Sequence, residues 1–290
     1  MSSIRLMRTF LAVAAEGSFA AAAPRVALTQ AAVGQQMRAL ESELRRPLFE
    51  RQGKAVMLND AGGALVPQAR RLVSLYEQMV GAGEPEAGGM AGTVHLGAVV
   101  SAVRGLIEAT LTLKARHAAL DLHVSAAKSM ELVERVLAGE LDAAIAVREP
   151  GAASPELGWT PLYGEPLVLL VPRTLHDLPA AKVLQSQPFI RFDRSQHTGR
   201  LIDKALKQLR ARPQEFLELN ALESIAELVR AGLGVSIVPQ LREARWAADP
   251  KLRLIELPRA EERRIALVRR RDSAKGAVVA ALARELQVKR

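Results

Sequence analysis

A glycine-rich segment near residue 90 constrains the fold of this chain more than any other feature. Residues 81–92, "GAGEPEAGGMAG", contain five glycines and one proline. Such a composition is typical of a hinge or linker, because both residue types disfavour regular helices and strands. Before this segment the pattern is helical and rich in small residues, and after it strands alternate with helices. The sequence therefore predicts two structurally different units joined near residue 90.

Composition narrows the classes of function. The 290 residues are 49% hydrophobic and only 3% aromatic, so two or three domains with cores of Ala, Leu and Val are expected. The 40 Lys and Arg exceed the 31 Asp and Glu, which favours polyanionic partners, although surplus arginine also improves solubility. The absence of cysteine excludes disulfides, thiolate chemistry and Cys-type metal sites. No apolar run approaches the ~18 residues of a spanning helix, so no membrane partner is expected.

The pattern after the linker is that of an α/β fold. "TVHLGAVV" and "LDLHVS" alternate apolar and polar residues, with a helix predicted over residues 103–116 between them. A further helix at residues 130–137 ends at Gly139 and leads into "LDAAIAV", a buried strand. The pattern then restarts, with strands at "EPLVLLVP", "PFIRF", "FLEL" and "GVSIVP" and helices at residues 200–209 and 222–231. This alternation predicts parallel sheets in two similar lobes.

The last segment is expected to return to the first lobe. It contains the strand "RRIALVRR" and a helix over residues 274–286. A ligand would bind between the lobes, since open parallel sheets bind at the carboxyl ends of their strands, where helix N-termini point inward.

The N-terminal stretch "LMRTFLAVAAEGSFAAAAP" has two interpretations. Arg5 and Arg8 before an apolar run resemble a secretion signal, but Glu16 cuts that run to about six residues, where roughly 7–15 are expected. Two short helices fit better, because apolar residues recur on one helix face and Gly17 ends the first helix. The second helix then carries Pro24, at which it is expected to end or bend.

The next helix carries a candidate recognition surface. Ser18 and Thr29 are predicted to cap the second and third helices. The inward face of the third helix is predicted to be Val33, Met37, Leu40 and Leu44, and its outward face Gln30, Gly34, Gln35 and Arg38. A helix, a short turn and a second helix with a basic, amide-rich outer face can enter the major groove. A plain three-helix bundle with a polar face explains the same spacing.

The following residues identify a family. "PLFERQGKAVMLN" predicts two short strands around a "RQGK" turn, a wing whose Arg51 and Lys54 could contact the DNA backbone or minor groove. The run "FLAVAAEGSF", "LTQAAVGQQMRALESEL", "PLFER" and "LNDAG" closely resembles the winged helix-turn-helix of LysR-type transcriptional regulators. "GTVHLGA", "LAGELDAAI", "EPLVLLVP" and "ELVRAGLGVSIVP" resemble landmarks of the effector domain of the same family.

The resemblance implies an α/β protein with an N-terminal winged helix-turn-helix, a linker helix and a two-lobed α/β effector domain similar to periplasmic binding proteins. The expected limits are residues 1–58 for the DNA-binding domain, 59–92 for the linker helix and hinge, and 93–290 for the effector domain, with lobe I at 93–162 and 262–290 and lobe II at 163–261. It also implies a cytoplasmic homodimer or homotetramer that binds double-stranded DNA, contacts RNA polymerase and responds to a small molecule.

The predicted DNA-binding residues follow from the helix pattern and this resemblance. They are Ser18, Thr29, Gln30, Ala31, Gly34, Gln35, Arg38, Arg51 and Lys54. Ala31 stands where the family usually has proline, and Gly34 where it usually has serine, so the base preference of relatives is not transferable.

Two further sets of residues are predicted to bind partners. Leu65, Ala69, Leu72, Tyr76 and Met79 form a coiled-coil-like seam that in this family pairs two subunits, although the spacing also suits a core-facing helix. The effector is expected at Ser101, Ser129 and Arg148 of the first lobe and at Phe192, Ser195 and Thr198 of the second. Ser129 and Thr198 could instead be helix caps, and Phe192 could be core. Helix N-termini with Arg148 suit an anionic effector.

Catalysis is not expected. "DRSQH", Asp193 to His197, contains the residue types of a Ser-His-Asp triad, but residues two apart in one segment do not by themselves provide its geometry. The five histidines lack metal-ligand spacing, and no phosphate-binding Gly-rich Lys motif is found, so no metal and no cofactor are predicted. A solute-binding protein and a catalytic α/β protein are the alternatives, and both leave the first 60 residues unexplained.

Overall fold

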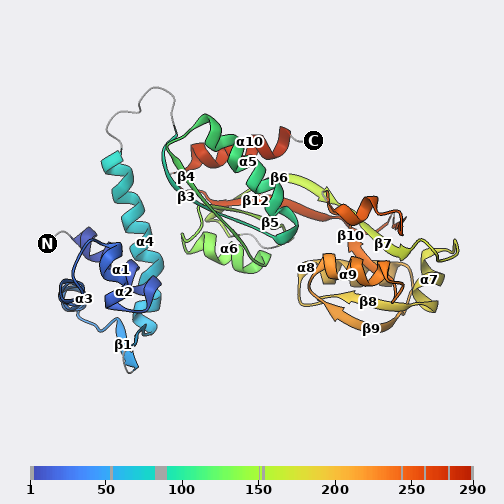
Figure 1. Ribbon diagram of the computed structural model, residues 1–290, viewed down its shortest axis with the longest axis horizontal. Coiled ribbons are helices and arrows are strands. Elements are labelled where there is room, and N and C mark those ends of the chain that lie inside the picture. Colours follow the sequence, from blue (N-terminus) through green and yellow to red (C-terminus); the bar gives the residue numbers. More distant parts are fainter. Residues whose placement is uncertain are drawn as a thin grey trace.

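The protein consists of three parts arranged in a row (Figure 1). The computed structural model describes residues 3–52, 55–81, 90–149, 151, 154–242, 244–257, 259–273 and 275–288. A small N-terminal head is followed by a long helix and then by two α/β lobes, which we call lobe I and lobe II. Each part has its own hydrophobic core. No described helix combines the length and the apolar character needed to cross a membrane.

The head is a three-helix unit with a two-stranded wing. Its elements are α1 (Ser3–Glu16), α2 (Phe19–Arg25), α3 (Gln30–Leu44), β1 (Phe49–Gln52) and β2 (Ala55–Leu58). Gly17 ends α1 in a left-handed conformation with a φ of 63°. The hydroxyl of Ser18 accepts a hydrogen bond from the N–H of Ala21, and that of Thr29 accepts one from the N–H of Ala32. The predicted helix boundary and both predicted caps are therefore confirmed.

Helix α2 ends one residue after Pro24, as predicted. Proline has no N–H to continue the helical ladder, so the chain leaves the helix at Arg25. The N–H of Leu28 then bonds to the carbonyl of Ala23, and Ala27 adopts a φ of 53°. This tight turn leads directly to the cap of α3.

Helix α4 (Asp60–Gly81) connects the head to the rest of the molecule. The side chain of Asn59 caps it by accepting a hydrogen bond from the N–H of Gly62 at 2.9 Å, and donates to the carbonyl of Pro47 at 3.1 Å. The first half of α4 packs on α1, where Leu65 and Ala69 join the core of the head. Most of the glycine-rich segment, residues 82–89, lies outside the described residues.

Lobe I has one mixed sheet of five strands in the order β4-β3-β5-β12-β6. Its elements are β3 (Gly92–Ala98), η1 (Val100–Ala102), α5 (Val103–Arg116), β4 (Leu120–Ala126), α6 (Ser129–Leu137), β5 (Ala143–Val147), β6 (Leu157–Glu165), β12 (Arg263–Arg270) and α10 (Gly276–Val288). Helices α5 and α10 cover one face of the sheet and α6 the other (Figure 1). The predicted return of the last strand and helix to this lobe is confirmed.

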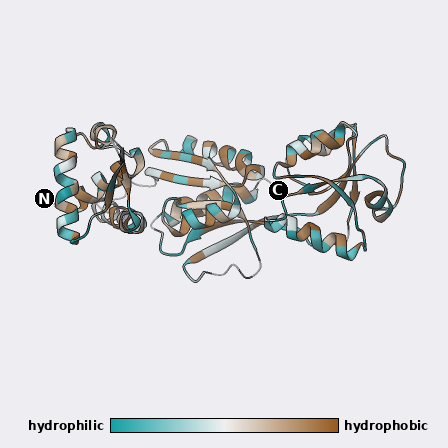
Figure 2. Ribbon diagram, turned by 90° about the horizontal axis from the view of Figure 1, so that it is seen from below, coloured by the Kyte–Doolittle hydropathy of each residue, from teal (hydrophilic) through white to brown (hydrophobic). Residues whose placement is uncertain are grey.

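Lobe II is built from the middle of the chain. Its elements are β7 (Leu167–Pro172), α7 (Ala180–Ser186), β8 (Pro188–Phe192), α8 (His197–Gln208), β9 (Gln214–Leu219), α9 (Leu222–Arg230), β10 (Ser236–Pro239), η2 (Arg245–Ala248) and β11 (Leu252–Glu256). The antiparallel group β10-β7-β11 is joined to the parallel pair β8-β9 by a bridge between Phe189 and Val235. The helices show bands of hydrophobic and hydrophilic residues (Figure 2), as expected where one face of a helix covers a sheet.

The prediction of parallel sheets throughout is wrong. Strands β3, β4 and β5 are parallel, but β12 runs antiparallel to both β5 and β6, and β7 is antiparallel to both of its neighbours. Strand β12 returns from lobe II and so enters the sheet of lobe I from the opposite end. Residues 157–165 form β6 along their whole length, so the predicted change of lobe after residue 162 falls inside this strand.

Candidate nucleic-acid interface and effector site

Helix α3 presents an exposed polar face at its N-terminal half. Gln30, Ala31, Gln35 and Arg38 are exposed, and so is the cap residue Thr29. The opposite face is buried in the head, where Val33, Met37 and Leu40 are at most 1% exposed. Leu44 is only partly buried at the edge of this core. The arrangement leaves two amides and a guanidinium on a surface next to a helix N-terminus, whose free N–H groups can meet a phosphate.

Gly34 does not belong to this exposed face. It is buried, and a Cβ added there would lie 3.9 Å from the ring of Phe19 and 3.9 Å from the guanidinium of Arg38. The predicted outward position is therefore wrong, because α2 packs against α3 at this point. Both distances are ordinary contacts, so a serine at position 34, as is usual in the family, would fit. Ser18, also predicted to bind DNA, is partly buried and caps α2.

A buried polar contact that sequence reasoning missed fixes α3 on α1. The hydroxyl of Thr9 donates to the side-chain oxygen of Gln36 at 2.6 Å, and both residues are buried. A buried amide is costly without a partner, so this bond specifies how the two helices face each other. The signal in the sequence was a glutamine directly before Met37 on the inner face of the helix.

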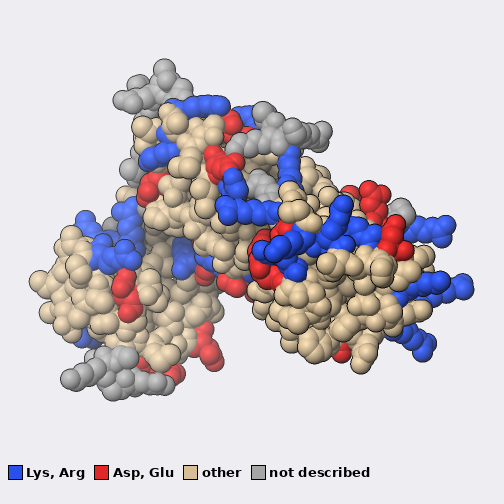
Figure 3. Space-filling model, turned by 45° about the vertical axis from the view of Figure 1, so that its right-hand side comes forward, with Lys and Arg blue, Asp and Glu red and all other residues tan. Residues whose placement is uncertain are grey.

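The wing is present as an antiparallel pair, with Arg51 opposite Val56 in the register. The side chain of Arg51 and the whole of Lys54 lie outside the described residues, so their predicted DNA contacts stay predictions. Residues 1–58 contain eight Lys or Arg and four Asp or Glu. Basic side chains are visible on the head and on both lobes (Figure 3), so net charge alone does not locate the DNA surface.

The predicted dimerisation seam is divided between two environments. Leu65 and Ala69 are 4% and 1% exposed and belong to the core of the head, which corrects their assignment to a subunit interface. Leu72, Tyr76 and Met79 are 44%, 40% and 77% exposed. An exposed Leu75 extends this apolar surface. Only the second half of α4 thus offers an apolar face to a partner.

The predicted effector residues of lobe I lie at the carboxyl ends of its parallel strands. Ser101 follows β3, and its hydroxyl accepts a hydrogen bond from Arg263 at 2.7 Å. Ser129 begins α6, and its hydroxyl accepts one from the N–H of Val147 at 3.1 Å, so it braces the end of β5. Arg148 follows that strand and is exposed, and within the described part of the chain its side chain makes no ion pair.

The predicted residues of lobe II are of two kinds. Phe192 is 4% exposed and is part of the lobe II core, so its prediction as an effector contact is wrong. All four residues from Phe189 to Phe192 are buried, so this end of β8 lies in the core. Thr198 lies in the first turn of α8 and is 3% exposed, without capping the helix. Ser195 is exposed in the loop before α8.

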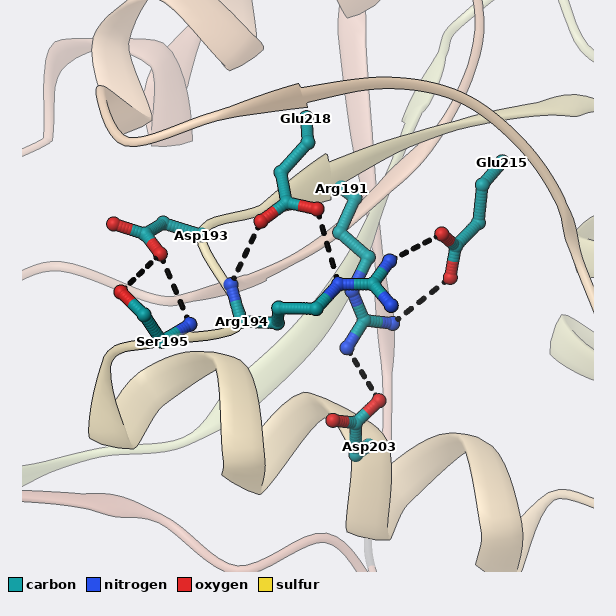
Figure 4. Close-up of polar contacts among 7 residues, drawn as sticks. All are labelled: Arg191, Asp193, Arg194, Ser195, Asp203, Glu215 and Glu218. Carbon is teal, nitrogen blue, oxygen red and sulfur yellow. Dashed lines mark hydrogen bonds and ion pairs between the residues drawn. The ribbon is translucent and has the colours of Figure 1, made fainter.

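The loop before α8 is organised around the carboxylate of Asp193 (Figure 4). One oxygen accepts hydrogen bonds from the N–H and the hydroxyl of Ser195, and the other accepts one from the amide of Gln196. These donors lower the pKa of Asp193 to about 2, so it carries a negative charge at neutral pH. Next to it, Arg194 donates to Glu218 from both its backbone and its side chain. The loop before α8 therefore carries a fixed negative charge.

A buried arginine lies beside this loop (Figure 4). Arg191 on β8 is 1% exposed and pairs with Asp203 on α8 and Glu215 on β9. Glu215 also pairs with Arg194. The network joins both strands of the β8-β9 pair to the helix that follows the loop.

The two lobes meet through ion pairs at this loop. Lys128, next to Ser129, lies 3.4 Å from Asp193, and Arg200 on α8 lies 2.5 Å from Glu149, next to Arg148. His197 is 3.7 Å from the same glutamate, and burial lowers its pKa, so Arg200 carries the charge of this contact at neutral pH. The predicted residues Ser129 and Arg148 are thus brought opposite the loop that holds Ser195.

These contacts do not form a catalytic triad. The hydroxyl of Ser195 donates to Asp193, whereas the ring of His197 lies beside Glu149. The acid therefore contacts the hydroxyl in place of the base. Among the described residues, no group of three or more His, Asp or Glu could hold a metal ion.

Comparison with known proteins agrees with this architecture. Residues 4–63 match the model of the bacterial regulatory helix-turn-helix protein of the lysR family, and residues 87–289 match that of the LysR substrate binding domain. The chain belongs to the LysR family. It is a LysR-type transcriptional regulator, with a helix-turn-helix for DNA and a substrate-binding domain for an effector.

Individual members of the LysR family resemble the chain over most of its length. It is 30% identical to the HTH-type transcriptional regulator YnfL of Escherichia coli K12 over 84% of this chain and 86% of that protein. It is 28% identical to a probable RuBisCO transcriptional regulator of Cyanophora paradoxa, over 81% and 76% of the two chains. A full-length OxyR variant of Pseudomonas aeruginosa has a TM-score of 0.79 at 21% identity, covering 99% and 95% of the chains. Full-length CbnR in complex with its target DNA has a TM-score of 0.66 at 22% identity and 99% coverage of both chains.

Proposed function

We propose that this LysR-type regulator binds a promoter as a homodimer or homotetramer through α3 and the wing, and that a small anionic effector between the lobes controls it. The observation that carries the proposal is the exposed face of Gln30, Ala31, Gln35 and Arg38 beside the N-terminus of α3. A solute-binding function does not explain the presence of this N-terminal head. Because the target is chromosomal DNA, we place the protein in the cytoplasm, where RNA polymerase is a further partner.

The chemistry of the α3 face suits base recognition in the major groove. Glutamine can pair with the adenine edge and arginine with the guanine edge, while the N–H groups near Thr29 suit a phosphate. Pairing of two subunits through the exposed apolar half of α4 would place two such helices at a fixed separation, which sets the spacing of the half-sites.

The proposed effector is an anion that binds on the lobe I side of the interlobe face. Arg148 supplies a positive charge there, and Ser129 lies at the start of α6, where the helix dipole favours negative charge. The lobe II side already holds the negative carboxylate of Asp193, which repels any anionic ligand close to it. No cofactor is required by this arrangement.

Replacing Arg38 or Gln35 by alanine should weaken promoter binding by about 1–3 kcal/mol each, because each removes a contact to a base edge. The measurement is a titration of the purified protein with the DNA upstream of its own gene, at several salt concentrations. The parent protein should bind selectively and with a steep salt dependence.

Arg116→Ala is the control for this experiment, since Arg116 lies in lobe I and pairs with Glu285. Equal loss of affinity in this variant would indicate a general charge effect. Equally weak binding of the parent to every DNA fragment would refute promoter recognition by this head.

Replacing Arg148 by alanine should abolish the stabilisation of the protein by its anionic effector. The expected result follows because Arg148 is exposed directly after Val147, whose N–H bonds to Ser129, while the neighbouring cation Lys128 is paired with Asp193. Thermal-shift screening of small carboxylates, phosphate and sulfate against the parent identifies an anion that raises the Tm, and the variant is then titrated with it. Binding of neutral ligands only, or an unchanged shift in the variant, would refute the anionic effector.

A further inference from the structure

Helix α4 contacts lobe I of its own chain as well as the head. The guanidinium of Arg70 lies 3.1 Å from the carboxylate of Glu140, which follows α6. The guanidinium of Arg71 lies 3.0 Å from the carboxylate of Asp272, which follows β12. In Figure 1 the helix runs beside the end of lobe I that carries α6 and the edge of the sheet. These contacts join parts of the chain that are separated by the glycine-rich segment.

The lobe side of this contact is held in place by other charges. Arg270 donates two hydrogen bonds of 2.9 Å to Asp272, which together lower the pKa of that carboxyl. Arg135 lies 3.5 Å from Glu140. Arginines of lobe I thus hold both carboxylates in place before the two arginines of the helix bind them.

The contact surface is small and polar. Between α4 and the lobe lies a cavity of about 70 Å³. It is lined mainly by charged side chains, among them Arg70 and Arg71 of the helix and Arg270 and Asp272 of the lobe, while Leu75 and Leu141 are its apolar residues. Lys275 and Asp142 pair with each other across 2.9 Å at its edge. Charged side chains thus outnumber apolar ones, and little hydrophobic burial holds the two parts together.

The helix uses different faces for its different contacts. Leu65 and Ala69 face the core of the head, and Arg70 and Arg71 face lobe I. Leu72, Tyr76 and Met79 stay exposed. Contact with lobe I therefore leaves the apolar face of α4 open to a second subunit.

We propose that an ionic clasp, Arg70 and Arg71 on α4 with Glu140 and Asp272 on lobe I, docks the linker helix on the effector half of its own chain and so fixes the orientation of the DNA-binding head. Ion pairs at an exposed surface are weak and are screened by salt, with a Debye length of about 8 Å at physiological ionic strength. The docked arrangement and a released one therefore differ little in free energy. Its regulatory meaning rests on the proposed function, because releasing the clasp would change the separation of two recognition helices in an oligomer.

The test measures the distance between head and lobe I directly. The sequence contains no cysteine, so cysteines introduced at two exposed positions are the only labelling sites. Ser42→Cys on α3 and Ala280→Cys on α10 carry nitroxide labels, and their separation is measured by double electron-electron resonance. Labelled chains are diluted with unlabelled ones, so that distances within one chain dominate in an oligomer.

The clasp predicts one narrow distance distribution for the labelled parent at low salt. The charge reversal R70E/R71E should broaden and shift it, and raising the salt concentration should do the same to the parent without any substitution. R71D alone should broaden the distribution, and the exchange R71D/D272R should narrow it again, because the exchange recreates an attractive pair. Arg116→Glu is the matched control, since Arg116 and Arg71 have side chains 61% and 60% exposed and each pairs with one carboxylate.

A distribution that is unchanged in R70E/R71E and at high salt would overturn the clasp, and so would equal broadening in Arg116→Glu. On promoter DNA, R70E/R71E should protect a different span from nuclease than Arg116→Glu does, and an identical span would refute the regulatory role. If the parent shows no selective DNA binding, the proposed function fails, while the distance measurement still decides whether the clasp exists.

Discussion

Replacing Arg263 by alanine is expected to lower the free energy of unfolding by about 3–5 kcal/mol, because it leaves a charged carboxylate buried without its partner. Arg263 begins β12 opposite Glu165 at the end of β6, and its Nε and Nη2 lie 2.6 and 2.5 Å from one carboxylate oxygen. The side chains are 5% and 1% exposed. Urea unfolding followed by fluorescence suits this measurement, since Trp159 lies in lobe I and Trp246 in lobe II.

The pH dependence distinguishes a charge effect from lost packing. Burial raises the pKa of Glu165, and the nearby Arg263 opposes this rise. Without Arg263, the pKa of Glu165 in the folded state rises further above its value in the unfolded state. The loss of unfolding free energy is therefore largest above this folded-state pKa, and it becomes smaller as the pH falls through it. The difference in unfolding free energy between the parent and Arg263→Ala should therefore become smaller in acid. A gap independent of pH would contradict this explanation, and Arg116→Ala, which removes an exposed pair, should cost only about 0–1 kcal/mol.

The head was predictable because its signals are local. Caps at Ser18 and Thr29, a stop at Gly17 and apolar residues three or four apart are each read from a few neighbouring letters, and the structure has all of them. Gly34 was misplaced for a non-local reason, since the ring of Phe19 arrives from another helix. The division of the α4 seam is similar, because its spacing does not state whether α1 or a second subunit covers Leu65 and Ala69.

The effector half was predictable in outline only. Strand β6 was missed because "LGWTPLYGE" contains two glycines and a proline and buries its residues without regular alternation. Helix α7 and strand β11 were missed as well, being short elements of seven and five residues. The direction of β12 could not be read from its letters, because it depends on the end from which the chain re-enters the sheet.

The interlobe site shows the same limit. Ser129 and Arg148 were predicted because each directly follows a strand or begins a helix, and their contact with an effector stays a prediction. The role of Asp193 was missed, because its charge matters only through contacts with Lys128 on the other lobe and with its own loop. Glu165 and Arg263 are 98 residues apart, so no local sequence pattern predicts that they pair.

Two adjacent glycines at the start of α4 should respond in opposite directions to the same substitution. A Cβ at Gly62 would lie 2.1 Å from the carbonyl oxygen of Leu48 and 2.8 Å from Leu58. A Cβ at Gly63 would meet nothing within 4 Å. Gly62→Ala should therefore destabilise the head by about 1–3 kcal/mol or more through overpacking against backbone. Gly63→Ala should stabilise it by about 0.5–1 kcal/mol, because alanine has the higher helix propensity.

A clash at Gly62 would also disturb the hydrogen bonds around Leu48 and Asn59. The carbonyl of Leu48 accepts a hydrogen bond from the N–H of Asn59, and the side chain of Asn59 caps α4 and bonds to Pro47. Pushing α4 away from Leu48 thus loosens the cap and the base of the wing together. Hydrogen exchange of the full-length protein, read for peptides of α1 and α3, measures the local stability of the head in both variants. Equal protection in the two variants would mean that α4 can shift at no cost, and the close approach at Gly62 would then not explain why glycine stands in "LNDAG".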